Sequence, residues 1–196
     1  MPRPSKKVRK PNTFAGRTMF GPEIMLNEPL ISGYLAAVSN AWATIEAVAA
    51  DMMAYLISEP HLTYKNLKLD PLGKALYGQL PTFRQRWAVL NRIIDTRFTE
   101  EELRQFEKRR KALNKTLQDA SDVRNMLVHS IWGQREGQDG ILIRSTPYLL
   151  LEESAWEPET IDADQLRQHV LDLQDARKAL EQFFSDTRNR KPMPPH

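Results

Sequence analysis

Apolar residues recur at helical spacing in four separate stretches of this chain, and this periodicity restricts the fold more than any other feature. The stretches are Ile31 to Leu56, Leu72 to Ile94, Leu103 to Leu127 and Leu166 to Phe184. Steps of three and four residues place such positions on one side of an α-helix. Amphipathic helices bury those sides most economically by facing one another. The sequence therefore predicts an all-α protein, an up-down helical bundle of four main helices.

Local signals predict where these helices begin and end. Ser58-Glu59-Pro60 should end the first helix, and Asp70-Pro71 supplies an N-cap and a first-turn proline for the second region. Pro81 should kink or split that region. Residues Thr99 to Glu102 have the form of a capping box and should open the third helix. The fourth helix is expected from Asp162.

The apolar period changes after the third helix. Residues 131–135 and 141–145 are short apolar segments separated by the glycine-containing residues 136–140. This pattern predicts a small β-hairpin, at about 131–145, inserted after the third helix. An isolated hairpin is only marginally stable, so it should pack on the helices. Residues 152–164 hold six acidic residues and no Lys or Arg, which predicts an exposed acidic loop.

The charge is distributed unevenly along the chain. Six basic residues precede the first acidic residue, Glu23, and three follow the last, Asp186, so that residues 18–187 carry −6 although the whole chain carries +3. With the prolines, this divides the chain into a flexible basic arm (1–27), a helical domain (28–187) and a basic proline-containing tail (188–196). Such ends can hold a polyanion through phosphate contacts, or can simply be solubilising disordered segments.

Composition excludes several kinds of site. The chain has no cysteine, so it has no disulfide, no thiolate zinc site and no cysteine nucleophile. No two of its four histidines are three or four residues apart, so no metal site and no cofactor are expected. No apolar run approaches the ~20 residues that span a bilayer. We therefore expect no membrane association and a soluble, cytoplasmic protein.

One cluster of polar residues near the end of the third helix has side chains that could bind an anion or take part in catalysis. Arg124 occupies a position on the apolar face where a leucine would be expected. A guanidinium there requires either a carboxylate partner or an anion in a wet cleft. Ser121, Asn125 and His129 are four residues apart and share one helix face, whereas Arg124 lies about 140° from His129. Arg124 must therefore reach around the helix or act on a second copy of the site.

Arg124, Asn125 and His129 resemble the R-x-x-x-x-H motif of the HEPN superfamily, and the helical pattern extends the similarity over roughly residues 28–187. The resemblance implies a metal-independent endoribonuclease with its cleft at a homodimer interface. His129 would act as general base or acid at the ribose 2′-hydroxyl or the 5′-oxygen. Arg124 would hold the scissile phosphate, and Asn125 would orient the imidazole or the phosphate. The products would be a 2′,3′-cyclic phosphate and a 5′-hydroxyl.

Two further residues are weaker candidates for binding substrate. Arg110 shares the apolar face of Arg124, and Ser121 shares the face of His129. The expected partners are RNA, a second copy of the chain and, for a toxin or defence effector, an antitoxin or regulatory protein.

A non-catalytic alternative remains open. Arg124 could pair with Asp122, Asp119 or Glu46, and His129 could cap its helix. The protein would then be a helical dimerisation or interaction module whose basic tails tether nucleic acid or an acidic partner. Cleavage of RNA in excess chelator separates the two classes.

Overall fold

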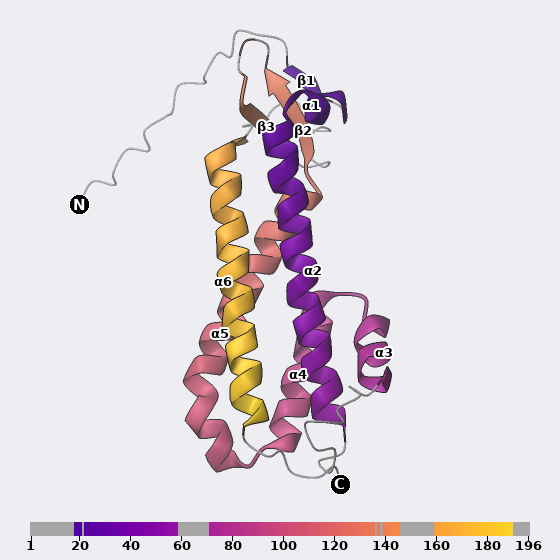
Figure 1. Cartoon of the computed structure of the whole chain (residues 1–196), viewed down its shortest axis with the longest axis vertical. Coiled ribbons are helices and arrows are strands. Elements are labelled where there is room, and N and C mark those ends of the chain that lie inside the picture. Colours follow the sequence, from indigo (N-terminus) through magenta and orange to yellow (C-terminus); the bar gives the residue numbers. More distant parts are fainter. Residues whose placement is uncertain are drawn as a thin grey trace, which may run out of the picture.

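The computed structural model describes residues 18–20, 22–58, 71–135, 137, 139–145 and 159–189. The elements, in chain order, are β1 (Thr18–Phe20), α1 (Pro22–Asn27), α2 (Pro29–Ile57), α3 (Pro71–Gln79), α4 (Phe83–Arg97), α5 (Glu100–Val128), β2 (Ile131–Arg135), β3 (Ile141–Ser145), β4 (Glu159–Asp162) and α6 (Ala163–Arg188). Figure 1 shows long helices side by side, with a small sheet at one end. The structure confirms a mainly helical fold.

Contacts between the long helices fix their directions. Trp42 of α2 meets Phe83 at the start of α4, with ring centroids 4.7 Å apart, while Arg97 at the end of α4 donates to the Ser58 carbonyl over 3.1 Å. Hence α2 and α4 run in the same direction. Figure 1 shows α6 running with them and α5 running back. Successive helices alternate in direction only when the short α3 is counted. The predicted up-down bundle of four main helices did not include this short helix.

The predicted apolar faces form the core. Along α2 and α5, the positions three and four residues apart are buried, and aromatic rings join the helices at the far end from the sheet. Phe106 of α5 packs edge-on against Phe98 and against Phe183 of α6, at 5.5 and 5.7 Å between ring centroids. The helices are therefore held mainly by apolar burial.

The helix ends follow the local signals wherever the structure describes them. Thr99 accepts a hydrogen bond from the Glu102 backbone N–H, and the Glu102 carboxylate accepts from the Thr99 backbone N–H over 2.8 Å. Asp162 and Gln165 form the same capping box at α6. Pro81 lies in the break between α3 and α4, confirming the split.

Helix α3 presents a different face to the core from the one expected. Leu72 and Leu76 are 56% and 46% exposed, whereas Gly73 and Tyr77 are buried. The reason is a close approach of two backbones, because a Cβ atom at Gly73 would lie 2.4 Å from the Cα atom of Ala54. Because Gly73 has no side chain, α3 can pack closely on α2 through this residue, and Leu72 and Leu76 then face outward.

The sheet contains the predicted hairpin and two further strands. Its order is β1-β2-β3-β4, all antiparallel. Gly137 and Gly140 have φ angles of 78° and 76°, which glycine adopts without strain. The Glu28 carboxylate accepts from Gln134 Nε2 (2.7 Å) and from the Gly140 N–H (2.9 Å), tying the hairpin to the start of α2.

Two expected irregular segments contain regular structure. The arm expected at 1–27 includes β1 and α1, and the acidic loop expected at 152–164 includes β4 and the first residues of α6. Backbone pairing explains the two strands, because β1 pairs with β2 and β4 pairs with β3. Residues 1–17, 152–158 and 190–196 lie outside the described residues. None of the helices described has the length and apolar character needed to cross a membrane.

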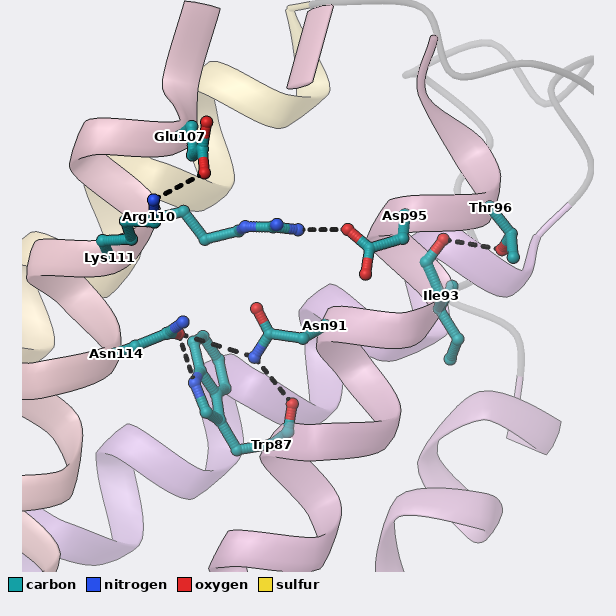
Figure 2. Close-up of polar contacts among 9 residues, drawn as sticks. All are labelled: Trp87, Asn91, Ile93, Asp95, Thr96, Glu107, Arg110, Lys111 and Asn114. Carbon is teal, nitrogen blue, oxygen red and sulfur yellow. Dashed lines mark hydrogen bonds and ion pairs between the residues drawn. The ribbon is translucent and has the colours of Figure 1, made fainter. Parts of the chain in front are cut away.

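Polar side chains connect α4 with α5 (Figure 2). Trp87 Nε1 donates to Asn114 Oδ1 over 2.7 Å, and Asn91 Nδ2 donates to the same oxygen over 3.5 Å. Further along, Arg110 forms an ion pair with Asp95. These contacts fix the rotation of α5 relative to α4, and with it the direction in which the motif residues point.

Candidate functional site

A pocket of about 620 Å³ lies between the C-terminal part of α5 and the start of α4. It is lined by Trp42, Glu46, Pro81, Thr82, Phe83, Arg84, Arg86, Gln118, Ser121, Asp122, Arg124, Asn125 and His129. Its volume falls in the range of small-ligand sites.

The motif residues reach this pocket because α5 ends there. The His129 backbone N–H donates to the Asn125 carbonyl over 3.0 Å and closes the helix, and β2 begins two residues later. Arg124, Asn125 and His129 line the pocket together with the buried Ser121. The side chains of Asn125 and His129 are exposed, whereas Arg124 is half-buried. A single chain thus brings four of the five predicted residues to one cavity.

Arg124 forms no ion pair with a carboxylate in the described part of the chain, although Glu46 and Asp122 line the same pocket. Its Nη1 donates to Asn125 Oδ1 over 3.0 Å, and its buried Nε has no hydrogen-bond partner. Two of the three carboxylates considered as partners bond elsewhere, since Glu46 pairs with Arg86 and Asp122 accepts from Gln118. A half-buried guanidinium of this kind is suited to bind an anion.

The opposite wall of the pocket contains a second, neutralised arginine. Arg86 Nε donates to the Leu80 carbonyl over 2.8 Å, and Arg86 Nη1 pairs with Glu46 over 2.9 Å. The same guanidinium lies 5.1 Å from the centroid of the Tyr77 ring. Burial, reinforced by the negative charge of Glu46, raises the pKa of Tyr77. The Tyr77 phenol therefore stays protonated and adds no negative charge beside Arg86.

Aromatic rings form another part of the lining. Phe83 packs edge-on against Trp42 and lies nearly parallel to Trp87, at 6.1 Å between ring centroids and an angle of 10°. Trp42 and Phe83 also line the pocket. Both were expected on core faces of their helices, and both do contact the core, so their second role was not apparent from the sequence.

Arg110 lies apart from these residues. It pairs with Asp95 (Figure 2) and is not among the residues that line the pocket. Its neighbours Arg109 and Lys111 pair with Asp186 and Glu107. The basic run on α5 is thus largely neutralised by acidic side chains, and Arg110 does not join Arg124 in one groove.

The sequence did not point to the wall supplied by Thr82, Arg84 and Arg86, and it indicated Glu46 only as a possible partner of Arg124, whereas Glu46 pairs with Arg86. These residues come from α2 and α4, and only the packing of those helices brings them to α5. The Pro81-Thr82 pair, which starts α4 at the pocket, was the one local signal near them.

The chain was compared with models of known protein families, with curated proteins and with solved structures, and no match was found.

Proposed function

We propose that this protein is a metal-independent endoribonuclease of the HEPN type, with a helical bundle as its scaffold. One observation carries the proposal. Arg124, Asn125 and His129 line a single pocket, and Arg124 has no acidic partner among the described residues. A cation, an amide and an imidazole are the groups that 2′-hydroxyl attack on a phosphodiester requires.

The reaction follows from the chemistry of these side chains. The His129 imidazole takes the proton of the ribose 2′-hydroxyl, whose oxygen attacks the adjacent phosphorus while the bond to the 5′-oxygen breaks. That oxygen leaves with a proton supplied by an imidazolium. Arg124 stabilises the charge that develops on the phosphoryl oxygens, and Asn125 holds the Arg124 guanidinium in place. The products are a 2′,3′-cyclic phosphate and a 5′-hydroxyl, and DNA is resistant because it lacks the nucleophile.

The proposal includes a homodimer, as the resemblance implies. A symmetric pair of chains would supply two imidazoles, one as base and one as acid. Val128, next to His129, is an apolar residue that is 42% exposed, and it lines a shallow groove of about 280 Å³ with Leu35 and Trp132. We place the second copy on this surface. A cytoplasmic toxin or defence effector with RNA as substrate and an antitoxin or regulatory protein as partner would fit such an enzyme.

The deciding experiment is incubation of the purified protein with mixed RNA in excess chelator, followed by analysis of fragment ends for cyclic phosphate. Arg124→Ala and His129→Ala should each reduce cleavage by at least about 10²-fold. Their thermal melts should change little, because both side chains lie at the pocket and not in the core. Arg92→Ala and His169→Ala are matched controls outside the pocket and should cut like the wild type.

The non-catalytic alternative predicts different results. No fragments would form with any variant, and the Arg124 change would weaken dimerisation or lower the melting temperature. Undiminished cleavage by a purified Arg124→Ala, His129→Ala double variant would refute the assigned roles.

A further inference from the structure

The first turn of α4 faces the motif residues across the pocket and carries groups that the proposed cleavage does not use. Phe83, Arg84 and Arg86 lie there, opposite Arg124 and His129. Binding of a single phosphate would need only the residues that α5 contributes to the pocket, so the residues of α4 are available for another part of the ligand.

Arg84 differs from Arg86 in the same way that Arg124 does. Glu46 neutralises Arg86, whereas Arg84 is exposed and forms no ion pair with any residue that the structure describes. Among the described residues, the pocket therefore has two guanidinium groups that form no ion pair, one on each wall, and one carboxylate that forms none, that of Asp122. Two such cations suit a ligand with more than one phosphate, because each phosphate of a nucleic acid strand carries one negative charge.

Phe83 supplies a surface of a different kind. Its half-buried ring packs edge-on against Trp42 and lies nearly parallel to Trp87, and Phe83 also lines the pocket. A ring fixed by its neighbours loses little conformational freedom when a flat ligand stacks on it. An unpaired nucleobase is such a ligand.

We propose that the first turn of α4 forms a second subsite, in which Arg84 binds the phosphate next to the scissile one and Phe83 stacks on an adjoining base. This inference rests on the proposed function, and it adds a requirement. A base can stack on Phe83 only when it is not paired, so the substrate is a single-stranded segment with at least two phosphates. Arg84 and Phe83 bind substrate and take no part in proton transfer.

Binding tests the subsite independently of cleavage. The protein with His129→Ala is titrated against a fluorescein-labelled single-stranded oligoribonucleotide and against the same strand annealed to its complement, by fluorescence anisotropy. The single strand should bind at least about fivefold more tightly than the duplex. Adding Arg84→Gln should weaken binding about fivefold and reduce the slope of log K against log salt by about 0.7. Arg92→Gln, an exposed arginine of α4 outside the pocket, is the control and should do neither.

The aromatic contact needs a conservative pair of variants. Phe83→Leu should weaken binding of the single strand about fivefold and leave binding of the duplex nearly as it was, whereas Phe83→Tyr keeps a ring and should retain the affinity. Thermal melts identify a Phe83 variant that fails to fold. In that event Arg84→Gln, a change at an exposed side chain, still decides the proposal.

Cleavage provides the second arm. With catalytically intact protein, the loss in kcat/KM caused by Arg84→Gln should be larger for an oligoribonucleotide than for a dinucleoside monophosphate, which has one phosphate only. If Arg84→Gln and Arg92→Gln behave alike, or the duplex binds as tightly as the single strand, the subsite is refuted even when RNA is cut. If RNA is never cut but the binding pattern is found, the nuclease assignment fails and the subsite stands.

Discussion

Two arginines of the same pocket show how a neighbouring side chain decides what a charge can do. Arg86 lies between the Glu46 carboxylate and the Leu80 carbonyl, and its position is fixed. Arg124 bonds only to the neutral amide of Asn125 among the described residues. An incoming phosphate would have to displace Glu46 to reach Arg86, but it would meet Arg124 directly. At the scale of single residues, one carboxylate, that of Glu46, separates an arginine held in an ion pair from an arginine that can receive an anion.

Tyr77 permits a prediction on pH. Burial raises its pKa, while a tyrosine in the unfolded chain titrates near the ordinary value of about 10. Above that pH the unfolded state loses the proton first, so the free energy of unfolding should fall as pH rises towards the raised pKa. Tyr77→Phe removes this dependence, and its melting temperature should fall less than that of the wild type between about pH 8 and pH 11. Tyr34→Phe, a half-buried tyrosine of α2 outside the pocket, should keep the wild-type dependence.

The sequence predicts one wall of the candidate site and not the other. Arg124, Asn125 and His129 lie within one helix end, so helical geometry alone brings them close. Glu46 and Arg84 meet them only because α2 and α4 run in parallel and place their residues beside the end of α5. That arrangement depends on the tertiary packing, for which single-sequence patterns carry no signal.

At the scale of elements, the contact of α3 with α2 predicts an asymmetry between two glycines. Gly73→Ala places a methyl group 2.4 Å from the Ala54 Cα atom, and because both atoms belong to rigid helices the change should cost about 1–3 kcal/mol in the free energy of unfolding. Gly78→Ala, in the same helix, meets nothing within 4 Å and should stabilise by up to about 1 kcal/mol. Urea unfolding measures both. Equal effects would show that α3 does not depend on this approach.

The elements differ in how well local patterns predict them. A capping box needs only four consecutive residues, and the one predicted at Thr99 forms, while the helix expected from Asp162 begins there with a capping box of its own. The buried face of α3 does not follow its leucines, because Gly73 contributes a packing surface by lacking a side chain, and hydrophobic patterns do not count glycine. Strand β1 is three residues long and exists through its pairing with β2, so its own sequence hardly indicates it.

At the scale of the molecule, the proposed homodimer can be tested on the surface beside the motif. Light scattering should give about twice the 22.7 kDa of one chain. Val128→Glu places a charge on that surface and should yield the monomer, because an unpaired charge buried in an interface is strongly unfavourable. Leu171→Glu on α6, at a residue of similar exposure, is the control and should remain dimeric. A monomeric wild type would contradict the dimer.

The strand order shows that residues near the N-terminus cover an edge of the sheet that would otherwise be open. Thr18 to Phe20 pair with Arg135 to Gly133 and so cover one edge of β2. A shortened chain that starts at Pro22 would keep every helix but leave the backbone N–H and C=O groups of that edge open to strands of other molecules. Expression of such a truncated chain should therefore favour self-association through the sheet, and recombinant versions are best begun upstream of Thr18.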